Sequence, residues 1–174
     1  MNKFRSHNCS ELNEKYIGKK VKLSGWIHRK RDHGNLLFLD IRDHFGLTQC
    51  VIENKDKNFK ILEKAKPESV ISVIGEVVKR SKDTENKELK TGLIEVKISD
   101  VEILSEAKEL PMPVFGEQDY PEETRLKYRF IDLRRSSMHE NLKLRSKVLN
   151  FLRSKMLENS FMEFQTPILT ASSP

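Results

Sequence analysis

The chain has 174 residues, of which 37% are hydrophobic and 33% charged, and its formal net charge is +6. Its length accommodates one ordinary domain and part of a second. No apolar run approaches a membrane span, the N-terminus lacks the apolar stretch of a secretory signal, and two distant cysteines predict no disulfide framework, so we expect a cytoplasmic protein with no membrane partner.

Alternation of apolar and polar residues predicts a mainly β domain in the first part of the chain. The predicted strands are 20–27, 36–42, 47–53, 70–79 and 93–104. Between the third and fourth strands, residues 56–66 change to helical spacing, with Asp56 in the N-cap region and Pro67 at the exit. Five strands with a helix after the third are the layout of an OB-fold, although another small β-barrel is the alternative.

The same alternation assigns side chains to the two faces of the predicted strands. The residues expected to face the core are Val21, Leu23, Gly25, Ile27, Leu37, Leu39, Ile41, Ile94, Val96 and Ile98. The outward face is then expected to carry Phe38, Gln49 and Glu95, each on a different strand.

Basic and aromatic residues gather in the segment 29–49, which predicts a nucleic-acid site. The run Arg29-Lys30-Arg31 precedes the strand with Phe38, and an outward aromatic ring can stack an unpaired base for about 1–3 kcal/mol. Arginines can hold phosphates and an amide can read a base edge. The alternative is that Phe38 packs under a loop and the basic run is a solvated face, since many basic proteins bind no nucleic acid.

The second part of the chain has a different pattern. Three prolines and a glycine in 105–124 predict a linker with neither helix nor ladder strand, and a basic amphipathic segment follows at 125–135. Residues 138–158 predict a long helix, and 161–166 predict a strand ended by Pro167. The apolar stripe of the helix consists of Leu144, Val148, Phe151, Leu152 and Met156. The predicted divisions are 1–109 for the barrel, 110–135 for the linker and hinge, and 136–174 for the start of a further domain.

Nothing in the sequence indicates catalysis. It contains no glycine-rich phosphate loop, and the five histidines and two cysteines show no metal-ligand spacing. We find no arrangement of a nucleophile with a base. We therefore expect no catalytic residue, no metal site and no bound cofactor in this chain.

Several segments resemble bacterial-type aspartyl-tRNA synthetases, which are class IIb aminoacyl-tRNA synthetases. The matching segments are GWIHRKRDHGNLLFLDIRDHFGLTQ (25–49), TGLIEV (91–96), RLKYRFIDLRR (125–135) and LRSKVLNFLRSKMLENSFMEFQTPILT (144–170). The first two resemble the anticodon-binding domain, the third resembles the hinge, and the fourth resembles the helix and strand of class II motif 1. The resemblance implies an N-terminal part that ends just after motif 1, in a truncated α+β catalytic domain.

The resemblance also implies a role for each residue of the predicted site. Phe38 would stack on the central anticodon base, a uridine, and Gln49 would form hydrogen bonds with it. Glu95 would read the guanine at the first position. Arg29 and Arg31 would contact the anticodon backbone or bases.

Three further positions take a role from the resemblance. Arg80 matches a position near the third anticodon base, but Thr84 stands where some relatives have Asn, so the reading of that base is open. His33 is frequent in enzymes that also charge the asparagine tRNA, which favours a nondiscriminating enzyme for tRNA(Asp) and tRNA(Asn). Pro167 matches the motif 1 proline at the homodimer interface.

Motifs 2 and 3, which bind ATP in the family, lie beyond these residues. The full-length parent would use ATP and Mg²⁺ to form aspartyl-adenylate and then acylate tRNA, whereas this chain alone should be inactive and bind neither. Two alternatives are a free-standing OB-fold RNA-binding module with a dimerising tail, and a purely structural dimerisation unit.

Overall fold

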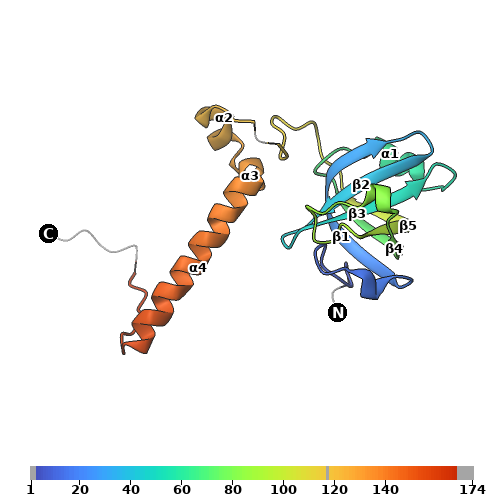
Figure 1. Cartoon of the computed structure of the whole chain (residues 1–174). Coiled ribbons are helices and arrows are strands. Elements are labelled where there is room, and N and C mark those ends of the chain that lie inside the picture. Colours follow the sequence, from blue (N-terminus) through green and yellow to red (C-terminus); the bar gives the residue numbers. More distant parts are fainter. Residues whose placement is uncertain (1–2, 117, 168–174) are drawn as a thin grey trace. The chain divides into compact units, whose positions relative to one another are not determined.

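Figure 1 shows the computed structural model of the chain, in which residues 3–116 and 118–167 are described. The chain divides into two compact units, Met1–Pro111 and Met112–Pro174. The first unit is mainly β and the second is helical.

The first unit is a closed five-stranded barrel, which confirms the OB-fold expectation (Figure 1). Its strands are β1 (Lys20–Asp32), β2 (Leu36–Arg42), β3 (Leu47–Glu53), β4 (Val70–Lys79) and β5 (Ile94–Ser105). They neighbour one another in the order β1-β2-β3-β5-β4, and β1 also pairs with β4. Among the strand pairings of the described residues, only that of β3 with β5 is parallel. The helix α1 (Phe59–Lys64) joins β3 to β4, and two short 3-10 helices are Glu14–Tyr16 and Lys82–Thr84.

Two predicted elements of the first unit differ in length from those in the structure. β1 continues five residues beyond the predicted end at Ile27, because its second half pairs with β2 after a register shift between Ile27 and Arg29. α1 begins at Phe59 because Asp56 forms a turn of its own, in which its carboxylate accepts a hydrogen bond from the Asn58 backbone N–H at 2.8 Å.

The core lies inside the barrel, where the residues predicted to face inward are buried. Leu23, Leu39 and Ile41 are fully buried, and the other residues predicted to face the core are buried as well. Gly75 in β4 lies at a register shift in the pairing with β5. A Cβ atom there would lie 2.4 Å from the Lys97 carbonyl oxygen, so only glycine lets β4 and β5 approach this closely.

The described residues of the second unit form three helices: α2 (Glu122–Lys127), α3 (Arg129–Asp132) and α4 (Ser136–Glu158). The expectation that 105–124 contains no helix was wrong at its end, because α2 begins at Glu122. Pro121 is its N-cap residue, and a proline at a helix start sacrifices no intrahelical hydrogen bond. Buried Asp132 pairs with Arg125 at 3.2 Å and with Arg129 at 2.8 Å, which ties α2 to α3.

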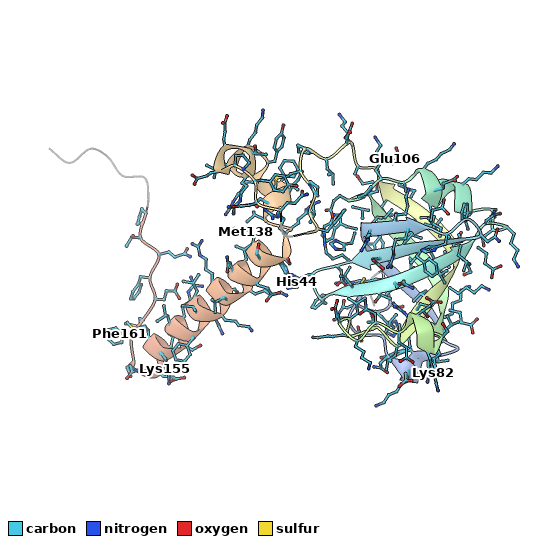
Figure 2. All side chains as sticks on the ribbon, turned by 45° about the horizontal axis from the view of Figure 1, so that its top comes forward. His44, Lys82, Glu106, Met138, Lys155 and Phe161 are labelled. Carbon is cyan, nitrogen blue, oxygen red and sulfur yellow. The ribbon has the colours of Figure 1, made fainter. Side chains whose placement is uncertain are left out.

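α4 confirms the predicted long helix, and it begins two residues earlier than expected, at Ser136. Its apolar stripe is exposed: Leu144 is 62% and Phe151 60% exposed. Figure 2 shows Met138 near the start of α4, Lys155 near its end and Phe161 just after it. No described helix is both long and apolar enough to cross a membrane.

The strand predicted at 161–166 is not formed. Residues 161–167 have no regular secondary structure and are exposed. A strand needs a neighbour to satisfy its backbone hydrogen bonds, and the described part of the second unit contains only helices. The motif 1 resemblance also extends over residues 168–170, which lie outside the described residues.

Candidate nucleic-acid interface

Three adjacent strands place the predicted site residues on one outer face of the barrel. Phe38 comes from β2, Gln49 from β3 and Glu95 from β5, and β3 lies between the other two strands. Asp40 of β2 is the direct cross-strand partner of Gln49. The period-two alternation that buries the core residues therefore also brings these polar side chains together.

A chain of hydrogen bonds connects four side chains of this face. The Arg31 Nη2 atom donates to Asp40 Oδ1 at 3.0 Å and Oδ2 at 3.2 Å, and also to Gln49 Oε1 at 2.9 Å. The Gln49 Nε2 atom donates to Glu95 Oε2 at 2.8 Å. Gln49 points outward as predicted, but these neighbours cover it, so that only 6% of it is exposed. The four side chains thus form one connected network.

Phe38 lies beside this network and remains partly exposed. The His33 ring meets the Phe38 ring edge-on, with 5.4 Å between centroids and 89° between planes. A cavity of about 180 Å³ adjoins both Phe38 and Glu95. Its lining is completed by Leu36, Val51, Glu53, Val78 and Lys97. A flat apolar wall and a hydrogen-bonding carboxylate therefore face the same space.

Arg80, at the end of β4, is buried beneath the site. It is 5% exposed, its Nε atom donates to the Ile94 carbonyl at 2.9 Å, and its Nη1 atom donates to the Thr84 carbonyl at 3.3 Å. Its Nη2 atom has no hydrogen-bond partner among the described residues. Burial lowers the pKa of Arg80, while the nearby carboxylates of Glu95 and Asp40 raise it.

The pKa of Asp40 is affected in the opposite direction by burial and by its charged neighbours. Burial raises the pKa of its carboxyl, and the positive charges of Arg31, Arg80 and Arg29 lower it. The Arg31–Asp40 ion pair is half-buried, with 37% of the arginine side chain and 14% of the aspartate side chain exposed. Two carboxylates and two guanidinium groups therefore lie together in the site, and their charges largely compensate one another.

The basic run at the end of β1 separates into three different environments. Arg29 is exposed. Arg31 joins the network on the outer face. Lys30 turns toward α1, where its Nζ atom donates to the Ala65 carbonyl at 2.8 Å and contacts the Glu63 carbonyl. Lys30 thus neutralises the C-terminal end of the helix rather than adding to the outer face.

The part that Asp40 has in the site was not predicted. Alternation places Phe38 and Gln49 outward, but periodicity alone does not show that Asp40 joins Arg31 to the site. Pairing of the two predicted strands in register was the available signal, since it places Asp40 opposite Gln49.

No described group of three or more His, Cys, Asp or Glu side chains is placed to hold a metal ion.

Two family models match the chain. Residues 21–104 match the OB-fold nucleic acid binding domain, and residues 121–174 match the class II tRNA synthetases (D, K and N). The barrel is therefore an OB-fold nucleic acid binding domain, and the segment that follows it is of the class II tRNA synthetase type.

Individual relatives narrow the family further. The chain is 60% identical over its whole length to the aspartate–tRNA(Asp/Asn) ligase of Pelagibacter ubique (strain HTCC1062), and it spans 29% of that protein. It belongs to the aspartyl-tRNA synthetase family.

Solved structures show the same fold. The asparaginyl-tRNA synthetase from Pyrococcus horikoshii complexed with asparaginyl-adenylate has a TM-score of 0.80 and 28% identity, over 93% of this chain and 36% of that one. The aspartyl-tRNA synthetase from Entamoeba histolytica has a TM-score of 0.82 and 20% identity, over 94% of this chain and 39% of that one.

Proposed function

We propose that the barrel binds the anticodon of tRNA(Asp) and that the chain is the anticodon-binding part of an aspartate–tRNA ligase. The observation that carries the proposal is the convergence of Phe38, Gln49 and Glu95 on one outer face of an OB-fold barrel. Such a face binds unpaired nucleotides, and these three side chains supply the stacking surface and the hydrogen-bonding groups that bases require.

Each side chain then has a separate task in reading the anticodon. Phe38 stacks on the central base, a uridine, and the Gln49 amide forms hydrogen bonds with its edge. The Glu95 carboxylate accepts hydrogen bonds from the guanine at the first position. A carboxylate suits this task, because it can pair with the donor groups of guanine while it repels phosphate.

The arginines contribute in two ways. Arg29 and Arg31 contact the anticodon backbone or bases, and the exposed Arg29 is the better placed for phosphates. Arg80 is buried, so we propose that it acts on the third base by holding the Thr84 carbonyl in the connection that follows β4.

We also propose that the enzyme charges tRNA(Asn) in addition to tRNA(Asp). The His33 and Phe38 rings are in edge-on contact, so His33 would lie beside a nucleotide that stacks on Phe38. The relative from Pelagibacter ubique is named for both tRNAs.

The whole protein would activate aspartate with ATP and Mg²⁺ in the cytoplasm and transfer it to tRNA. Its parts would be the anticodon-binding domain 1–109, the linker and hinge 110–135, and the beginning of the catalytic domain 136–174. We propose that the exposed apolar stripe of α4 and the segment around Pro167 meet a second copy in a homodimer, since exposed apolar side chains need cover.

Titration of the 174-residue chain with anticodon stem-loops at fixed salt tests the proposal, because salt changes all RNA affinities. We expect loops carrying GUC and GUU to bind more tightly than a loop with an unrelated triplet. Equal binding of all three would make the barrel a general RNA binder and remove the residue roles. Binding of GUC alone would keep the anticodon role and remove that of His33.

Phe38→Ala tests the stacking surface in the same assay. We expect it to weaken binding of the GUC loop by about 1–3 kcal/mol, while the barrel remains folded. Phe45→Ala is the matched control, because Phe45 is also exposed on this unit but lies in the turn between β2 and β3. Equal effects of the two substitutions would remove Phe38 from the site.

A further inference from the structure

The side-chain amide of Gln49 is held at both ends by groups that permit one orientation. Its oxygen accepts from Arg31 Nη2 at 2.9 Å, and its nitrogen donates to Glu95 Oε2 at 2.8 Å. A guanidinium has only donors, and an ionised carboxylate has only acceptors. Turning the amide by half a rotation would set donor against donor and acceptor against acceptor, so the charges on its two neighbours fix its direction.

Asp40 in turn holds Arg31 in the place from which it reaches the amide. Both carboxylate oxygens of Asp40 accept from the same Arg31 Nη2 atom that donates to Gln49. The strand register sets this geometry, because Arg31 pairs with Phe38 and Asp40 pairs with Gln49. Without the Asp40 carboxylate, the long Arg31 side chain would lose its anchor and gain rotamer freedom.

The direction of the amide decides which pyrimidine it can pair with. Uracil presents the N3–H donor beside the O4 acceptor, whereas cytosine presents the N3 acceptor beside the N4 donor. An amide has one donor end and one acceptor end, so a freely turning glutamine can pair with either base. A glutamine that is fixed in one direction satisfies one pyrimidine and leaves unpaired groups against the other.

We infer that Asp40 is a positioning residue that makes the site select uridine over cytidine at the base read by Gln49. Asp40 acts through Arg31 and needs no contact with the base itself. The inference rests on the proposed function, since it assumes that Gln49 reads an anticodon base.

The test compares stem-loops carrying GUC and GCC, which differ only at the central base, in wild type and in Asp40→Asn. Asparagine keeps the size of the side chain but loses the charge and one acceptor oxygen. We expect the wild-type preference for GUC over GCC to fall about tenfold in Asp40→Asn. Asp100→Asn is the matched control, an exposed aspartate on β5 that should leave the preference unchanged. A merely structural role of Asp40 would weaken both loops together and leave their ratio intact.

The outcomes separate this inference from the proposed function. An unchanged ratio in Asp40→Asn, or a wild type that binds GUC and GCC equally but better than an unrelated triplet, would overturn the inference and keep the anticodon role. A wild type that binds no loop above the unrelated one would overturn the proposed function itself. If thermal unfolding shows that Asp40→Asn is not folded, Asp40→Ser takes its place, with the same expected ratio.

Discussion

Acidification should destabilise the barrel through His28, a partly buried residue of β1. Its Nδ1 atom lies 3.0 Å from Arg42 Nη1, so the neutral ring can accept a hydrogen bond from the guanidinium. Burial, followed by the positive charges of Arg42 and Arg29, lowers the pKa of His28 from 6.5 to about 4. The folded protein therefore keeps this ring neutral over a pH range in which the unfolded chain protonates it.

The sign and size of the effect follow from this difference. Because the folded pKa is the lower one, the contribution of His28 to stability is complete above pH 6.5 and is lost as the pH falls toward about 4. The full difference between the two pKa values corresponds to about 3 kcal/mol of stability. Solvent screening around the partly exposed ring reduces this contribution to about 1–2 kcal/mol.

Urea unfolding of wild type and His28→Gln at several pH values between about 7.5 and about 4 measures this contribution. Glutamine keeps an acceptor for Arg42 but does not titrate. Titrating carboxylates contribute equally to both proteins, so their effect cancels in the difference. We expect the wild type to lose about 1–2 kcal/mol more than the variant. Parallel pH profiles would refute the assignment to His28.

The remaining predictions concern packing, helix capping and base reading. Gly75→Ala should cost about 1–3 kcal/mol in urea unfolding, because its new methyl group would collide with the Lys97 carbonyl. Lys30→Met should cost about 1–2 kcal/mol in the same assay, since it removes the charged donor at the end of α1. Glu95→Gln should relax the preference for GUC over AUC loops more than it changes total affinity, and a uniform loss would contradict base reading. Arg29→Gln should weaken all loops alike and reduce the salt slope of binding by ~0.7, a change that an unaltered slope would contradict.

The barrel was predictable from the sequence because its signal is local and repeated. The ranges predicted for 36–42, 47–53 and 70–79 coincide with β2, β3 and β4. β2 alternates along its whole length, whereas β3 and β4 are short runs rich in apolar residues, and turn residues separate these strands from their neighbours. The same alternation placed Phe38 and Glu95 on the outer face.

The connections between side chains were not predictable in this way. The bond from Lys30 to the Ala65 carbonyl spans 35 residues, and the bond from Arg31 to Gln49 spans 18. Alternation predicts which face of the sheet a residue occupies. The partner of a long side chain depends on how the strands pair, which alternation does not specify. For that reason three consecutive basic residues looked equivalent in the sequence and have different surroundings in the fold. The missing strand at 161–166 has a related cause, since a strand pattern does not specify the neighbour that the strand needs.

Positive and negative charges in the site nearly balance, so the site contributes to the selection of bases more than to the attraction of the RNA backbone. Asp40 and Glu95 face Arg31 and Arg80, so this cluster offers little net charge to a phosphate, and its value lies in the direction of its donors and acceptors. Attraction to the RNA backbone must then come from exposed cations outside the cluster, such as Arg29. It follows that salt should weaken binding of matched and mismatched loops in parallel, whereas substitutions inside the cluster should change their ratio.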